Sequence, residues 1–300
     1  MKATLTTVGV CLSLSVAQAS AGFEVAGACT RDDFSSSGRL LNSAHYEFKI
    51  VVDGCRFDLT LKEAGSEEDY REVASDGAST FYVSVFRTAV ERARAKEGQV
   101  GENIASATVL KRSVPNLGSY SPAGEIWLAY ASGWYFAKYE LGKQGQVRTG
   151  EIDLASGYGT AAGSDVEELR EKRPARWILA ENAGAPKWVA FFEGGFARSH
   201  VAPDGSFRRV SLPAVYANGF TNSLFVVLEE TNSPAGAYAA RSRLTSYWVK
   251  PDGVSSNDLW AKHVYTIVAT NCSTGRTGVV TPPALPGPTL IVEGRFVDDV

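Results

Sequence analysis

Apolar and polar residues alternate most regularly along residues 45–62, HYEFKIVVDGCRFDLTLK. A period of two predicts a pair of β-strands, and Asp53-Gly54 between them is a favoured two-residue turn, because type I′ turns need positive φ. A lone hairpin is only marginally stable in water, so its apolar face needs a larger sheet. The predicted cross-strand pairs on that face are Val52–Cys55, Ile50–Phe57, Phe48–Leu59 and Tyr46–Leu61, and on the other face Lys49 meets Asp58.

Further strands are predicted where similar alternation, or a short apolar run, is bounded by turn residues. The first strand covers 23–29 and is followed by a polar, serine-rich loop at 30–43. Residues 89–98 could form either a helix or the tip of a second hairpin. We favour the hairpin, whose second strand would be 104–111. The other predicted strands are 70–74, 79–86, 176–181, 187–193, 207–212, 224–230, 238–249, 262–270 and 290–297.

Two segments carry a different pattern. Residues 124–141 are apolar in both phases of a strand, which predicts a strand buried on both faces or one that switches faces at Ser132-Gly133. Residues 164–173 are the clearest predicted helix, because Ser164 can cap it, Glu167 follows three residues later and Pro174 ends it.

Long strands in hairpin order indicate a mainly β fold, namely a large curved antiparallel sheet. We expect an unclosed or partly closed β-barrel with one or two short helices. A signal peptide is predicted at 1–21 and a single β domain at 22–300. That domain comprises an N-terminal meander at 22–141, a helix-containing connection at 142–175 and a C-terminal meander at 176–300.

Residues 1–21 have the pattern of a cleaved secretory signal. Lys2 is basic, an apolar run extends from Leu5 to Val16, and small residues spaced for cleavage follow. The run is too short to cross a bilayer, and its alternative is a buried first strand or helix. We expect a periplasmic or secreted protein with no transmembrane segment in the mature chain.

Charge and cysteine content narrow the expected partners. Of 30 Lys and Arg residues, Lys2 is lost with the signal and 33 Asp and Glu remain, so the mature net charge is −4. This balance argues against nucleic acid as a partner. After Cys11 is removed, Cys29, Cys55 and Cys272 remain, and an oxidising compartment favours one pair. We predict a Cys29–Cys55 disulfide, because both residues are in phase with the apolar face of their strands; three buried thiols are the alternative.

No catalytic signature, metal-ligand spacing or cofactor motif is present, so we predict no catalytic residues, no metal and no cofactor, and lean against an enzyme. The concentrated feature is aromatic, and it indicates either the lining of an apolar cavity or a solid core. The candidate ligand-binding residues are Tyr46, Phe48, Phe57, Trp127, Trp134, Phe136, Trp188 and Trp248, with Phe81 and Phe192 in the same aromatic set.

The signal, the strand at Phe23, the long hairpin and the strand that runs through Ser75-Asp76-Gly77 into TFYV resemble the LolA-type lipoprotein carriers over about residues 23–139. The resemblance implies an exported half-open barrel whose apolar inside holds acyl chains under a helical lid. It therefore implies binding or carriage of a lipid or another apolar ligand. The alternatives are a structural or interaction module with an envelope protein partner and, less favoured, a hydrolase of envelope glycans.

Overall fold

The structure is a computed structural model, and it describes residues 22–64, 70–75, 79–86, 104–111, 122–137, 147–160, 166–179, 186–193, 197–201, 207–211, 213–234, 236–250, 252–274 and 289–295. The predicted signal peptide at 1–21 and the hairpin tip at 89–98 lie outside the described residues.

The elements are as follows. The strands are β1 Phe23–Phe34, β2 Leu40–Asp53, β3 Arg56–Glu63, β4 Tyr70–Ser75, β5 Ser79–Phe86, β6 Ile104–Lys111, β7 Arg148–Thr160, β8 Val166–Leu179, β9 Pro186–Glu193, β10 Ala197–Val201, β11 Phe207–Ser211, β12 Phe220–Ser233, β13 Gly236–Val249, β14 Leu259–Thr274 and β15 Thr289–Arg295. The helices are α2 Pro122–Tyr130, α3 Gly133–Ala137 and the short 3-10 helix η1 Ala214–Tyr216.

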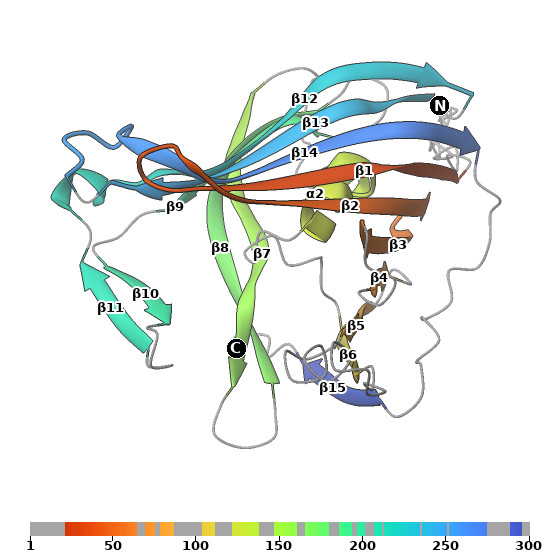
Figure 1. The fold of residues 1–300 in the computed structure, drawn as a ribbon, viewed down its shortest axis with the longest axis horizontal. Helices are drawn as coiled ribbons and strands as arrows, with labels where there is room; N and C mark the ends of the chain where they lie inside the picture. The colour runs from red at the N-terminus through yellow and green to blue at the C-terminus, as the bar shows by residue number, and fades with distance from the viewer. Residues whose placement is uncertain are drawn as a thin grey trace, which may run out of the picture.

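In the described part of the chain, thirteen strands form one curved sheet in the order β15-β6-β5-β4-β3-β2-β1-β14-β13-β12-β9-β8-β7, and β10 and β11 pair separately. The pairings within the sheet are antiparallel except those of β15, which lies parallel to β6 and to the start of β8. The first strand is central, because β1 pairs with both β2 and β14 and so joins the two meanders. The prediction of a mainly β fold with a large curved antiparallel sheet and two short helices is confirmed (Figure 1).

The hairpin from β2 to β3 keeps the predicted faces but not the predicted register. Asp53 pairs with Arg56, so the two-residue loop is Gly54-Cys55 rather than Asp53-Gly54, and Val52 faces Phe57. Moving the loop by one position moves every partner by two residues, and a two-residue shift leaves each side chain on its original face. Alternation alone therefore could not separate the two registers. The predicted Lys49–Asp58 pair is replaced by a salt bridge from Lys49 to Glu24, 3.0 Å long.

The predicted polar loop at 30–43 is instead mostly strand. β1 continues to Phe34 and β2 begins at Leu40, which leaves five connecting residues at 35–39. In this stretch Arg31 pairs with Tyr265 of β14 and with Ala44 of β2. Hydrogen bonding to two neighbouring strands holds these polar residues in the sheet in spite of their low apolar content.

The predicted strand at 124–141 is wrong over 124–137, where α2 and α3 lie, and residues 138–141 lie outside the described residues. Pro122 stands at the first helical position, where its missing N–H is harmless. At the other end the Ser132 hydroxyl donates to the Leu128 carbonyl at 2.7 Å, and Gly133 then begins α3. A segment that is apolar in every phase is typical of a helix buried on all sides as well as of a buried strand.

The predicted helix at 164–173 is also wrong, because residues 166–173 belong to β8. This strand pairs with β7 from Val166 opposite Thr160 to Trp177 opposite Arg148. Pro174, expected to end a helix, lies within the strand opposite Glu151. Helix propensity is a weak preference, and pairing along a fourteen-residue strand overrides it here.

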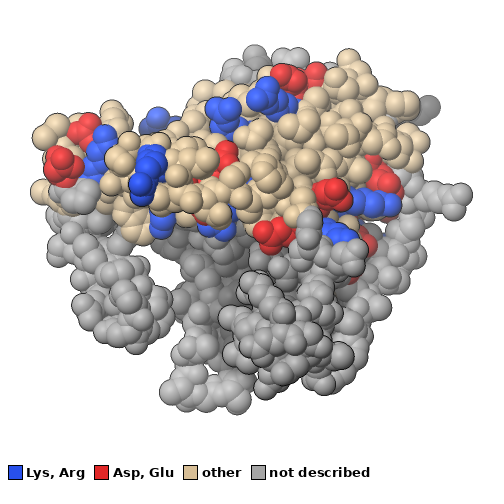
Figure 2. Space-filling view, in the orientation of Figure 1, with Lys and Arg blue, Asp and Glu red and all other residues tan. Residues whose placement is uncertain are grey.

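The core lies on the concave side of the sheet, and α2 lies there against β1, β2, β3, β13 and β14 (Figure 1). Alternate residues of β2 and β3 are buried, from Tyr46 to Val52 and from Phe57 to Leu61. On the face shown in Figure 2, acidic and basic side chains are interspersed among other residues. Arg241 of β13 pairs with Glu229 of the neighbouring strand β12 at 3.7 Å.

Candidate functional site

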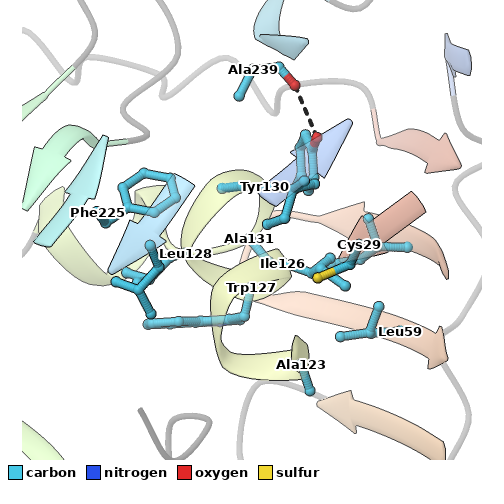
Figure 3. Close-up of a cluster of buried hydrophobic side chains, with 14 of the residues drawn as sticks. Cys29, Leu59, Ala123, Ile126, Trp127, Leu128, Tyr130, Ala131, Phe225 and Ala239 are labelled. Atoms are coloured by element: carbon cyan, nitrogen blue, oxygen red, sulfur yellow. Dashed lines mark hydrogen bonds between the residues drawn. The ribbon is translucent and has the colours of Figure 1, made fainter. Parts of the chain in front are cut away.

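Helix α2 is the feature around which the candidate site is built, because all nine of its residues are buried. Figure 3 shows Phe225 of β12 toward Leu128 on one side of the helix, and Cys29 of β1 toward Ile126 on the other. Apart from Glu125 its side chains are apolar or aromatic, so the helix has no polar face to turn to water. Helix α2 therefore fills space on the concave side of the sheet that an elongated apolar ligand could also fill.

Tyr130 attaches the end of α2 to the sheet. Its hydroxyl donates a hydrogen bond of 2.9 Å to the Ala239 carbonyl of β13 (Figure 3), and its ring stacks on Phe48 of β2 with centroids 5.8 Å apart. Burial is the main reason why the pKa of Tyr130 is raised, so the hydroxyl remains a donor throughout the neutral range. Tyr130 thus connects α2 to two strands, to β13 through a hydrogen bond and to β2 through an aromatic contact.

A chain of aromatic rings joins α2 to α3 and to β8. Tyr135 contacts Trp127, Trp134 and Phe136 edge-on, with centroid distances of 5.7, 5.9 and 5.6 Å. Phe136 in turn lies 6.0 Å from Trp177 of β8. Edge-to-face pairs of this kind add a fraction of a kcal/mol to about 1.5 kcal/mol each beyond the area they bury. Both helices are consequently held in place by ring contacts.

The structure brings together six of the eight predicted ligand-binding residues. Tyr46, Phe48, Phe57, Trp127 and Phe136 belong to the concave core, and Trp134 is partly buried against it. The other two lie elsewhere. Trp188 alternates along β9 with Val189 and Phe191, which are in the core, so it is on the opposite face. Trp248 packs in a separate cluster with Tyr216, Phe220, Val249 and Leu259, and the Lys262 ammonium lies 4.0 Å from its ring.

The predicted Cys29–Cys55 disulfide is wrong, since both residues and Cys272 are free thiols. Cys29 lies opposite Tyr46 in the middle of the sheet, whereas Cys55 is in the hairpin loop after Asp53. Seven residues of strand separate Tyr46 from Asp53, roughly 23 Å at 3.3 Å per residue. A disulfide needs Cα atoms within about 7 Å. The alternation of each strand indicated the face on which each cysteine lies, but it did not indicate how far apart the two cysteines are along the strands.

Glu125 is the one acidic residue of α2, and sequence reasoning missed it. Its side chain is 1% exposed, and among the described residues neither carboxyl oxygen has a hydrogen-bond partner. Burial raises the pKa of Glu125 well above its usual range, against the opposing effect of Arg31. Burial therefore favours the neutral form of this carboxyl. A buried polar group without partners is rare, because desolvating it costs about 1–3 kcal/mol.

One end of the concave face is polar. Arg31 and Asp33 follow Cys29 in the same phase of β1, and His263 precedes Tyr265 in the same phase of β14. The same Asp33 oxygen accepts hydrogen bonds from Arg31 Nε at 2.8 Å and from His263 Nδ1 at 2.6 Å. Burial works against the Asp33 charge, but these two bonds outweigh it and lower its pKa. We refer to Arg31, Asp33, His263 and Tyr265 as the polar end.

Two further properties of the polar end are a cation–π contact and a shifted pKa. The Arg31 guanidinium lies 5.9 Å from the Tyr265 ring. Burial is the main cause that lowers the pKa of His263, so its imidazole is neutral at pH 7. The sequence offered one signal for this group: residues 29, 31 and 33 alternate as a strand would. That signal was hidden when residues 30–43 were interpreted as a loop.

Within the described part of the chain, no group of three or more His, Cys, Asp or Glu could hold a metal ion. None of the helices described is long and apolar enough to cross a membrane. The described residues thus define a mainly β protein whose curved sheet carries a short helical pair on its apolar concave side.

Comparison with solved structures gives weak similarities, among them one to a LolA superfamily protein and one to a DUF1329 family protein. No protein-family model matches the chain, and no curated protein matches it. A LolA superfamily protein from Nitrosomonas europaea aligns with 10% identity and a TM-score of 0.40, covering 87% of this chain and 90% of its own. A DUF1329 family protein from Desulfovibrio piger aligns with 6% identity and a TM-score of 0.31, covering 86% and 87%. TM-scores this low support no conclusion, so function has to be inferred from this chain's own residues.

Proposed function

We propose that this protein is exported and binds an apolar ligand, such as a lipid or an acyl chain, on the concave side of its sheet. The ligand takes the space that α2 and α3 occupy, so the helices move aside when it binds. The signal-like pattern of residues 1–21 supports export. The pairing of β1 with β14, which joins the two meanders, supports one β domain over residues 22–300.

The observation that carries this proposal is Glu125. A permanent core tends to satisfy a buried carboxyl or to replace it by an apolar residue, because an unpaired polar group destabilises the folded state. Glu125 has neither a hydrogen-bond partner among the described residues nor exposure to water. A carboxyl at this position is accounted for if α2 also has an undocked state, in which Glu125 is hydrated.

The energetics allow such an exchange. An acyl chain that enters the concave face regains the apolar burial that α2 gives up, at about 0.8 kcal/mol per buried CH₂. Among the described residues, the hydrogen bond from Tyr130 to Ala239 is the one that side chains of α2 donate to the sheet. Loosening that attachment should therefore favour the ligand-bound state.

Tyr130→Phe tests the proposal directly. It removes the hydroxyl but keeps the ring on Phe48, so α2 should be released more easily. A hydrogen bond of this kind contributes about 1 kcal/mol, which corresponds to about fivefold tighter binding. Binding is measured by titrating delipidated protein with a neutral fluorescent acyl alcohol, and hydrogen exchange of residues 122–137 is followed with and without the probe.

The matched control is Tyr216→Phe. It also loses a buried hydroxyl, the donor of a 2.7 Å hydrogen bond to the Asp258 carbonyl, but in the separate cluster around Trp248. This control should bind the probe as the wild type does. If the folded, lipid-free wild type shows no saturable binding, or if exchange in 122–137 does not quicken on binding, the proposed function is wrong.

A further inference from the structure

We propose that the polar end is a head-group subsite, so that the ligand of the concave face is an amphipathic molecule whose anionic head, a carboxylate or a phosphate ester, is held by Arg31. This inference rests on the proposed function and deepens it, because it names the chemical class of the ligand and the residue that selects it.

The first ground is the way Arg31 is oriented. Its Nε donates to Asp33 Oδ1, and Asp33 is fixed in turn by His263 from the neighbouring strand. Within the described residues, no further hydrogen bond of the guanidinium is found, so its two terminal nitrogens keep their N–H donors. A guanidinium fixed along one edge presents the other as a planar fork, the geometry that binds carboxylate or phosphate through two parallel hydrogen bonds.

The second ground is accessibility. The Arg31 side chain is 32% exposed, whereas its neighbour in the same phase, Cys29, is fully buried. The concave face thus changes within two residues of β1 from an apolar interior to a charged rim. An acyl chain can lie over Cys29 and Val25 while its head group remains next to Arg31 at the edge.

The third ground is charge. Arg31 is cationic, Asp33 is anionic and His263 is neutral, so the polar end carries no net charge and an added anion meets little repulsion. Arg31 also acts electrostatically on Glu125, the one carboxyl of the otherwise apolar helix α2. Helix α2 therefore has the same polarity as the proposed ligand, an apolar body with one carboxyl that interacts electrostatically with Arg31 and Tyr265 of the polar end.

The test is competition against the neutral acyl alcohol probe at pH 8. The competitors share one chain length and differ only in the head: dodecanoic acid, monododecyl phosphate and dodecanol. Acetate and inorganic phosphate alone separate a lipid head group from a free anion. The wild type should bind the two anionic lipids about tenfold or more tightly than dodecanol, since hydrogen bonds to charged groups are the stronger kind.

Arg31→Met should reduce that preference to about twofold or less while dodecanol binds as before, because Met keeps the apolar stem and removes the fork. Arg31→Lys keeps the charge without the fork and should give an intermediate preference, which also provides a result if the Met variant does not fold. The matched control is Arg241→Met, an exposed arginine paired with Glu229, which should retain the full preference.

The outcomes separate the two proposals. Equal binding of acid, phosphate ester and alcohol, or a preference that survives in folded Arg31→Met, overturns the head-group subsite and leaves apolar binding intact. If inorganic phosphate binds in an Arg31-dependent way and no acyl compound binds, the site is one for a small anion, and both proposals are wrong.

Discussion

Asp58, on the face of β3 opposite the core, illustrates how one residue ties stability to pH. Burial is the main cause that raises the pKa of Asp58 to about 6, and the neighbouring carboxyl of Glu72 raises it further. An unfolded Asp has a pKa of about 3.9. The folded state therefore holds the proton more tightly, and this residue's contribution to stability falls as pH rises from about 4 through 6.

Asp58→Asn is expected to stabilise the protein at pH 8 and to be nearly neutral at pH 4. The gain should be about 1 kcal/mol, because Asp58 is only partly buried and solvent screens the interaction. Urea unfolding at the two pH values measures it. Asp252→Asn, at an exposed turn, is the control and should change neither value. A loss of stability at pH 8 would mean that Asp58 is held as a carboxylate.

The sequence predicted which face of a strand a residue occupies. It did not predict the residue's position along the neighbouring strand or its packing partners. Tyr46, Phe48 and Phe57 reach the concave core as their alternation indicated. Cys29 and Cys55 share a phase but are separated along the strand, which a period of two does not reveal. Glu125 is the sole acid of residues 122–137, and its burial became evident only once residues 122–130 proved to be a helix.

At the scale of elements, the hairpin β2–β3 depends on Gly54. Its φ is +63°, a left-handed conformation that β-branched residues avoid, although a Cβ placed there would meet no atom within 4 Å. Gly54→Val should therefore destabilise the protein by more than about 1 kcal/mol through backbone strain alone.

The midpoint of urea unfolding tests this expectation. Gly54→Asn is the matched substitution, because Asn tolerates the left-handed region, and it should be much closer to the wild type. Equal midpoints for the Val variant and the wild type would contradict the loop at Gly54-Cys55.

Elements were predicted correctly where one face is apolar and the other polar, as in β2, β3 and β13. In two segments a helix and a strand were mistaken for each other, and neither segment has one apolar and one polar face. Residues 122–137 are apolar in both phases of a strand apart from Glu125 and Ser132, so period could not decide between helix and strand. Residues 164–173 have the charges and the cap of a surface helix in sequence. The strand that pairs with residues 166–173, β7, is itself glycine-rich and weakly patterned.

At the scale of the whole molecule, Glu125 couples the position of α2 to pH. Docked, its carboxyl is kept neutral by burial; undocked and hydrated, it has an ordinary pKa of about 4.3. Above that pH, release of α2 is accompanied by release of a proton, so the docked state becomes less favourable as pH rises. Among the described residues, the other titratable or charged groups that pack against α2 or act electrostatically on it come from β1, β2, β13 and β14: Cys29, Arg31, Tyr46, Tyr238, Tyr265 and Cys272.

The neutral acyl alcohol should therefore bind more tightly at pH 8 than at pH 5, by at most about tenfold per pH unit for a single proton. Glu125→Gln removes the titrating group and should abolish most of this slope. Glu125→Leu should also weaken binding at every pH, since an apolar side chain keeps α2 docked.

Glu47→Gln, on the exposed face of β2, is the control and should keep the wild-type slope. Any slope that remains in Glu125→Gln is assigned to His263, which a His263→Gln variant checks. A wild-type affinity that is flat from pH 5 to 8, or that falls as pH rises, would show that α2 does not leave the sheet with Glu125 ionised.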